Sequence, residues 1–86
     1  MKYEKNLKII KNGYEEEYVY YVKECYSEEF KCQMYNVGIK SAYRKKEIDS
    51  FSPSREEAER LCDYLYDKNV DIESLFLMAE EFIVTG

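Results

Sequence analysis

The sequence predicts a single α+β domain in which an antiparallel β-meander is followed by an αα-hairpin packed on one face of the sheet. Two observations predict this fold. Residues 1–51 alternate polar residues with Tyr, Val and Ile, and an Asn-Gly pair interrupts them. Residues 52–86 instead carry apolar residues at helical spacing, together with helix-capping residues. A chain of 86 residues has room for one modest core, so we expect one domain, with the meander at 1–51 and the helical hairpin at 52–86.

The first predicted hairpin joins Tyr3–Lys11 to Tyr14–Tyr26, which is the longest run rich in aromatic and β-branched residues. The Asn-Gly pair between them is typical of a two-residue type I′ turn, because that turn needs a positive φ at both central positions. Such a turn fixes the register of the two strands, so that Leu7 lies opposite Tyr18.

The second predicted hairpin has Glu28 and Glu29 as its loop, followed by a third strand over about Phe30–Tyr43. This register places Val22 opposite Tyr35. Both hairpins then bury the same face of the sheet, and a slip of one residue in either would destroy that agreement. The predicted covered face consists of Tyr3, Leu7, Ile9, Tyr18, Tyr20, Val22, Tyr35, Val37 and Ile39.

The end of the sheet is less strongly specified. Gly38 indicates a bulge, a bend or a close backbone approach. After the polar connection at residues 44–46, Glu47–Phe51 fits either a fourth edge strand or an extended lead-in to the helices. The antiparallel sheet is therefore predicted to have three strands, or four if this segment joins it.

The first predicted helix begins near residue 54. Ser54 with Glu57 three residues later matches a capping box, and Ser52 followed by Pro53 is the competing start. Its apolar stripe, spaced at i, i+3, i+4 and i+7, consists of Ala58, Leu61, Cys62 and Leu65.

The second predicted helix follows a connection of only two or three residues, which makes a tight αα-hairpin. Lys68 and Asn69 suit the end of the first helix, and Asp71 suits the cap of the second. The predicted inward residues of the second helix are Leu75, Met78, Ala79, Phe82 and Ile83.

The composition disfavours an enzyme, and no metal or cofactor site is expected. The sequence has no histidine, which is the commonest general base and metal ligand. Cys25, Cys32 and Cys62 lack metal-ligand spacing and indicate a reduced, cytoplasmic chain. A disulfide between Cys25 and Cys32 stays conceivable, because the predicted register places them opposite each other. No apolar run approaches the ~20 residues that cross a bilayer, and no signal peptide is visible, so no membrane partner is expected.

Charge is divided unequally along the chain. Residues 1–46 hold ten Lys or Arg and seven Asp or Glu, a net of +3, whereas residues 47–86 hold three and eleven, a net of −8. Glu56, Asp63 and Asp67 are expected to face water from the first helix. A dense carboxylate face of this kind can imitate a phosphate backbone and occupy the basic channel of a nucleic-acid-handling enzyme. The alternative is an ordinary solvated helix face.

The uncovered face of the sheet is predicted to carry an apolar strip, in which Val19, Tyr21 and Met34 are the candidate partner-binding residues. Contiguous exposed apolar surface commonly marks a partner site, although scattered exposure is also normal on a small domain. The whole predicted strip contains Ile10, Val19, Tyr21, Cys25, Cys32 and Met34.

The C-terminal half resembles a family of short bacterial proteins of uncharacterised function. The residues that carry the resemblance are Tyr35–Ile39, Phe51–Ser54, Leu61, Asp71–Leu75 and Glu80-Glu81-Phe82. This sequence departs from the family pattern in having Ser54 and Glu81 where Asp is usual, and Ile72 where Pro is usual. The resemblance implies a strand followed by two helices and a Glu-Asp-Phe-like ending, and it implies no activity.

These observations predict a non-enzymatic, acidic protein-binding module. The concrete hypothesis is an inhibitor or regulator of a nucleic-acid-handling complex, acting by acidic mimicry as a phage or mobile-element anti-defence protein of the anti-CRISPR kind would. The alternative is a homodimer whose outer sheet faces pair. A third hypothesis, single-stranded nucleic-acid binding through Tyr21 and its neighbouring lysines, is disfavoured by the acidic helical half.

Overall fold

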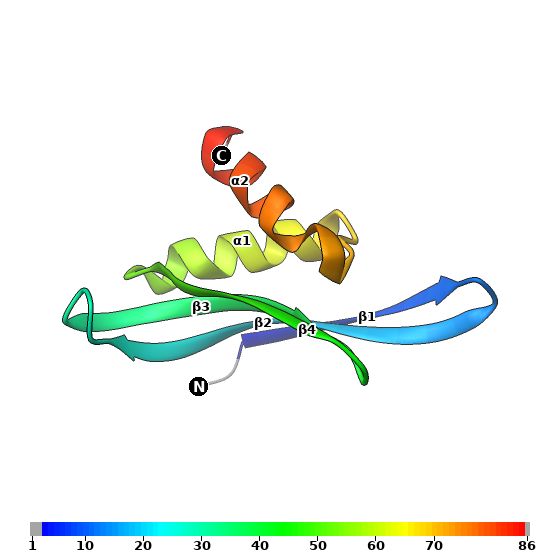
Figure 1. Ribbon diagram of the computed structural model, residues 1–86. Helices are drawn as coiled ribbons and strands as arrows, with labels where there is room; N and C mark the ends of the chain where they lie inside the picture. The colour runs from blue at the N-terminus through cyan, green and yellow to red at the C-terminus, as the bar shows by residue number, and fades with distance from the viewer. Residues whose placement is uncertain (1–2, 86) are drawn as a thin grey trace.

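The computed structural model describes residues 3–85, which form an open antiparallel sheet and two helices (Figure 1). The elements are β1 (Tyr3–Lys11), β2 (Tyr14–Ser27), β3 (Cys32–Lys40), β4 (Lys45–Ser52), α1 (Arg55–Asp67), the 3₁₀ turn η1 (Ile72–Ser74) and α2 (Leu75–Thr85). Within the described residues, the sheet has four strands in the order β1-β2-β3-β4. The predicted α+β meander is confirmed, and Glu47–Phe51 lies within the fourth strand.

The hairpin of β1 and β2 forms as its turn residues predict. Asn12 and Gly13 have φ values of 52° and 81°, the left-handed conformation that a type I′ turn requires. The register places Leu7 opposite Tyr18, as predicted. Local turn chemistry therefore determined the pairing of these two strands.

The predicted register of β2 with β3 is wrong by two residues. Val22 lies opposite Val37 rather than Tyr35. The reason is the turn, which spans residues 28–31 instead of two residues: Lys31 has a φ of 55°, and the Phe30 N–H donates to Ser27 Oγ at 3.1 Å. Because side chains alternate with a period of two, an even shift keeps the same residues on the covered face.

A bulge in β4 bends the outer edge of the sheet. The register shifts between Tyr35 and Val37, where β4 has two extra residues and Ser50 has a φ of 50°. Buried Asn36 fills the bulge: its Nδ2 donates to Glu47 Oε2 at 2.8 Å, and its Oδ1 accepts the Ser50 N–H at 2.8 Å. The bulged edge therefore has its own polar support.

The core lies between the sheet and the helices. The four predicted stripe residues of α1 are buried, and the Glu57 N–H donates to Ser54 Oγ at 3.2 Å, so Ser54 is the N-cap. Tyr20 is fully buried and donates its hydroxyl to the Val70 carbonyl at 2.8 Å. The buried core comprises Tyr18, Tyr20, Val22, Val37, Ile39, Ala58, Leu61, Cys62, Leu65, Val70, Ile72, Leu75, Ala79 and Phe82.

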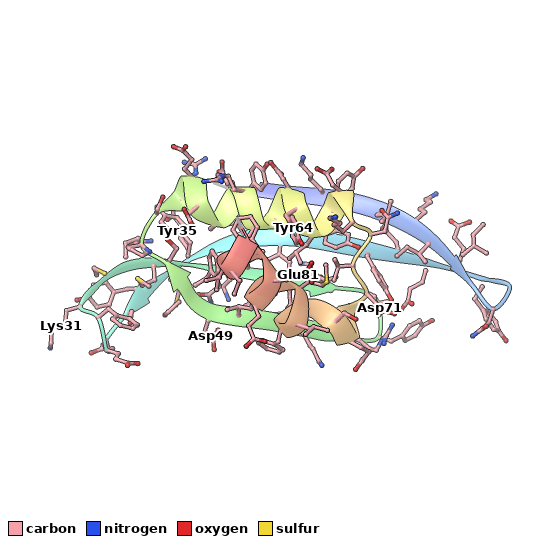
Figure 2. The ribbon with its side chains drawn as sticks, turned by 90° about the horizontal axis from the view of Figure 1, so that it is seen from above. Lys31, Tyr35, Asp49, Tyr64, Asp71 and Glu81 are labelled. Atoms are coloured by element: carbon pink, nitrogen blue, oxygen red, sulfur yellow. The ribbon has the colours of Figure 1, made fainter. Side chains whose placement is uncertain are left out.

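The two helices are joined by a longer connection than a tight hairpin has, and they lie differently on the sheet. The connection is longer than predicted, since η1 lies between them and Asp71 caps η1 by accepting the Glu73 N–H at 3.4 Å. Helix α1 lies along the sheet, whereas α2 rises away from it on the side of β4 (Figures 1 and 2). Leu75, Ala79 and Phe82 face the core as predicted, but Ile83 does not.

Candidate protein-binding surface

Much of the predicted apolar strip on the uncovered sheet face is buried within the protein. Tyr21 is only 6% exposed and Met34 only 5%, so neither side chain can offer much contact area, and the predicted exposure of these two residues is wrong. Val19 is half-buried, and Ile10 is exposed. The Cys25 thiol is exposed, and the register places Cys25 opposite Met34 instead of Cys32. The strip is therefore an unsuitable apolar partner surface.

Tyr21 is buried because the strand beside it has no side chain at Gly38. A Cβ on that glycine would lie 2.5 Å from the Tyr21 hydroxyl, so the ring rests directly on the backbone of β3. The hydroxyl donates to Glu47, and the Lys40 Nζ lies 5.2 Å from the ring centroid. Burial would raise the pKa of Glu47, but hydrogen bonds from Tyr21 and Asn36 outweigh it and lower that pKa.

The predicted acidic residues of α1 have different environments. Glu56 and Asp67 are exposed, whereas Asp63 accepts hydrogen bonds from the Tyr3 hydroxyl and from Lys5 Nζ at 3.0 Å. Burial would raise the pKa of Asp63, but these two donors lower it overall. Asp63 therefore joins α1 to β1, and the structure does not bring the three carboxylates together into one free acidic face.

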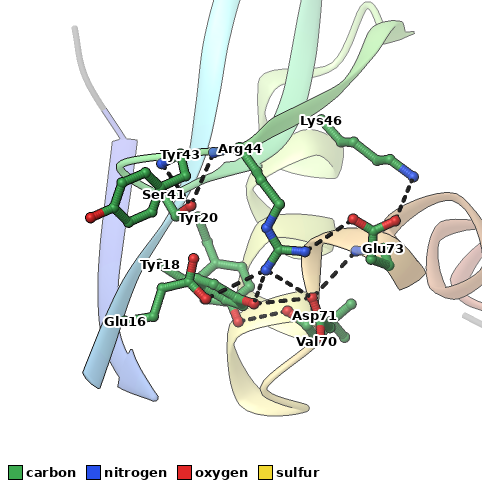
Figure 3. Close-up of polar contacts among 10 residues, drawn as sticks. All are labelled: Glu16, Tyr18, Tyr20, Ser41, Tyr43, Arg44, Lys46, Val70, Asp71 and Glu73. Atoms are coloured by element: carbon green, nitrogen blue, oxygen red, sulfur yellow. Dashed lines mark hydrogen bonds and ion pairs between the residues drawn. The ribbon is translucent and has the colours of Figure 1, made fainter. Parts of the chain in front are cut away.

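A larger polar cluster holds the helix connection against the sheet (Figure 3). Arg44, which follows the turn after β3, donates through Nη2 to the Tyr18 hydroxyl at 2.9 Å and through Nη1 to Glu73 at 3.0 Å. The Tyr18 hydroxyl donates to Asp71 at 3.0 Å. Much of the charge difference between the two halves of the sequence is thus satisfied internally, since cations of the sheet bind carboxylates of the helices. No sequence pattern singled out Arg44 for this role.

Helix α2 carries several of the large apolar side chains that are exposed among the described residues. Four large apolar side chains are exposed: Phe76 by 53%, Leu77 by 65%, Ile83 by 66% and Val84 by 81%. At 3.6 residues per turn they lie within an arc of about 120°, together with exposed Glu80. We call these five residues the α2 stripe. It includes none of the predicted partner-binding residues, and the signal that marks it in the sequence is a helix with apolar residues beyond its core-facing side.

The surroundings of the α2 stripe are polar. Lys46 Nζ lies 5.9 Å from the Phe76 ring centroid and 3.6 Å from Glu73, which precedes the helix. Glu80 is exposed in the middle of the stripe, with a large apolar side chain at positions i−4 and i+3. An apolar patch rimmed by charge is the usual arrangement of a protein-binding surface.

Other kinds of site receive no support from the described residues. Over residues 3–85, no group of three or more His, Cys, Asp or Glu side chains could hold a metal ion. In the same part of the chain, no helix is both long and apolar enough to cross a membrane. Comparisons with protein-family models, with curated proteins and with solved structures each returned no match.

Proposed function

We propose that this protein is a non-enzymatic protein-binding module, acting as a regulator or inhibitor, that docks the α2 stripe into an apolar groove of a different protein. The observation that supports this proposal is the exposure of four large apolar side chains on one face of α2. The opposite face of the same helix, with Leu75, Ala79 and Phe82, already anchors it to the core. The buried face of α2 is therefore enough to anchor the helix, and the fold does not need the exposed apolar face.

The spacing of the α2 stripe fits helix-in-groove recognition. Phe76 and Ile83 occupy positions i and i+7 of the pattern with which the apolar side of a helix fills a hydrophobic groove, and Glu80 lies between them at i+4. Because Glu80 lies at the centre of the stripe, the matching groove needs a Lys or Arg there; an apolar groove alone would leave a carboxylate buried without a partner. The proposed occupant is thus a protein with an apolar groove and a central cation.

A second copy of this chain fits the α2 stripe less well. An antiparallel pairing of two α2 helices about a two-fold axis would bring Glu80 close to its own symmetry mate, because residue 80 is the midpoint of 76–84. The net charge of −5 on each molecule adds to that repulsion. Charge therefore favours a heterologous, basic partner over self-association.

The test begins with a photo-crosslinking amino acid at Leu77, with the same group at Asp67 of α1 as a matched control. In cells that produce the natural chain, we expect one heterologous protein to be crosslinked from position 77 and not from position 67. That protein is then purified and its affinity measured by calorimetry. We expect Phe76→Ser with Ile83→Ser to weaken binding at least tenfold, since buried apolar anchors dominate interface energies.

A charge reversal separates specific docking from diffuse attraction. Glu80→Arg should weaken binding strongly, and Glu56→Arg, which makes the same change of charge on α1, should leave it within about twofold. A compensating reversal of the partner's cation should restore binding to Glu80→Arg. The proposal fails if only a homodimer is crosslinked, if no protein is crosslinked from position 77, or if the double Ser variant binds as tightly as the natural sequence.

A further inference from the structure

The first part of β2 extends beyond the strand that should pair with it. The β2–β3 ladder begins where Val19 lies opposite Lys40, and the chain then turns away into β4, with the Ser41 N–H donating to the Arg44 carbonyl at 2.8 Å. Tyr14–Tyr18 therefore has β1 on one side and no strand of the described chain on the other. In Figure 1 this portion of the β1–β2 hairpin extends well past the helices.

The turn geometry tells which backbone groups this open edge presents. In a type I′ hairpin, Lys11 and Tyr14 flank the two turn residues and form a hydrogen-bonded pair. Because the backbone groups of successive residues alternate in direction, the N–H and C=O groups of Glu15 and Glu17 point away from β1. No loop, turn or side chain of the described residues hydrogen-bonds to them. These are the groups with which an exposed edge accepts an added strand.

A groove runs along this edge. Its volume is about 780 Å³, within the range of ~300–1,000 Å³ that is typical of binding clefts. The rings of Tyr14 and Tyr43 line it and are 77% and 89% exposed. The lining residues are Asn12, Tyr14, Glu15, Glu16, Glu17, Val19, Lys40, Ser41, Ala42 and Tyr43.

The side chains on one face of this edge select for cations. Glu15, Glu17 and Val19 alternate along β2 and so share the sheet face opposite the helices. Lys8 lies opposite Glu17 in the β1–β2 register, and its Nζ is 3.5 Å from Glu15, so one cation serves two carboxylates on this face. A strand added beside β2 would place its residues i and i+2 directly opposite Glu15 and Glu17, where opposite charges are favoured.

We propose that this groove is a β-strand addition site, which binds an extended segment of a partner protein with Lys or Arg at alternate positions. The site is separate from the α2 stripe, so the two proposals stand or fall independently. Backbone hydrogen bonds to Glu15 and Glu17 supply the binding, and the two carboxylates fix the register.

A second copy of this chain does not supply such a segment. Arg44 and Lys46 are the only cations in the sequence that are separated by two positions. Both already bind Glu73 within their own molecule, at 3.0 and 3.6 Å. A nucleic acid is disfavoured because its phosphates would face the carboxylates of the groove.

The test uses two forms of the blocked peptide Thr-Lys-Val-Lys-Val-Lys-Thr, which differ only in the backbone nitrogens that carry methyl groups. In an added strand antiparallel to β2, the lysines opposite Glu15 and Glu17 also direct their N–H groups toward β2, and the valines direct theirs away. Methylation at the lysines should therefore weaken binding at least tenfold relative to methylation at the valines, at identical charge and identical side chains. Titration of isotope-labelled protein should shift the amide signals of residues 14–18 and 41–43.

Protein variants identify the carboxylates that matter. Glu15→Gln with Glu17→Gln should weaken binding of the valine-methylated peptide by about threefold to tenfold, while Glu56→Gln with Asp67→Asn should change it less than twofold. Glu17→Pro should abolish binding and keep the thermal unfolding temperature within a few degrees, because its lost N–H belongs to the open edge. Equal binding of the two peptides, equal weakening by both double variants, or signal shifts confined to other residues would each overturn the proposal. Self-association that moves the signals of residues 14–18 in the absence of peptide would assign the groove to a second copy instead.

Discussion

Helices α1 and α2 contribute to the same small core, but their solvent-facing sides differ: one is charged and the other is largely apolar. Both bury a stripe of apolar side chains, such as Leu61 and Leu65 in α1 and Leu75 and Phe82 in α2. The outward face of α1 is charged, whereas that of α2 carries the apolar side chains of the α2 stripe. A surface helix needs only one apolar side to fold. The second apolar side of α2 is therefore the feature of the two helices that folding leaves unexplained.

The largest predicted effect on stability distinguishes buried apolar positions of the helices from exposed ones. Leu61→Ala in α1 removes a fully buried side chain and should lower the free energy of unfolding by about 2–5 kcal/mol. Leu77→Ala in α2, which is 65% exposed in the natural protein, should change it by less than about 0.5 kcal/mol. Urea unfolding followed by far-ultraviolet circular dichroism measures both. If Leu77→Ala lowered the free energy of unfolding as much as Leu61→Ala, the α2 stripe would belong to the core, and α2 would have no second apolar side facing water.

The sequence specifies α1 better than α2 for a physical reason. In α1, polar residues occupy the outward positions, so the period of 3.6 identifies the buried face, and all four predicted residues are buried. In α2, apolar residues occur on every side, so periodicity cannot choose a face, and Ile83 was placed inward when it is 66% exposed. Packing against β4 and α1 makes the choice, and no local signal encodes it.

A similar limit explains the errors in the sheet. The Asn-Gly pair fixed the β1–β2 register because its turn type is local chemistry. The turn after β2 depends on Lys31 in a left-handed conformation, which its sequence does not indicate. The burial of Tyr21 depends on Gly38 of the neighbouring strand, and only the correct register brings those two residues together. The predicted exposure of Tyr21 on the outer face is wrong for that reason.

The next effect concerns the connection between the two helices. Arg44→Met should lower the urea midpoint of unfolding, because it removes charge-assisted hydrogen bonds to the Tyr18 hydroxyl and to Glu73. The loss should shrink in 1 M salt, which screens the natural ion pairs. Arg60→Met offers a matched control, because the ion pair of Arg60 with Glu57 on α1 is exposed and long, at 4.0 Å. Equal losses in the two variants would mean that the Arg44 cluster does not hold the helix connection.

A smaller effect depends on pH and concerns the charged face of α1. The pKa of Asp63 is lower in the folded protein than its usual value near 3.8, despite partial burial, because of the donors Tyr3 and Lys5. The unfolded chain therefore binds the proton more readily, so Asp63 stabilises the fold above about pH 4, and this stabilisation is lost as the pH falls through the lower folded pKa. Asp63→Asn should lower stability at pH 7 by up to about 1 kcal/mol and flatten the decline of stability below about pH 4. Urea titrations at several pH values measure the slope, and an unchanged slope would contradict the assignment.

The smallest expected change in stability is the most informative about α2. Phe76→Ser with Ile83→Ser removes two exposed apolar side chains, so the free energy of unfolding should stay within about 0.5 kcal/mol of the natural value. The same variant should bind less of a fluorescent hydrophobic dye and dissolve to a higher concentration, because the exposed apolar area of the α2 stripe falls. A matched exposed change on α1, Glu56→Ser, should alter neither property. If the double variant keeps its stability but loses partner binding, the α2 stripe serves recognition and not folding. If the double variant unfolds instead, α2 needs both of its apolar faces, and it differs from α1 in packing alone.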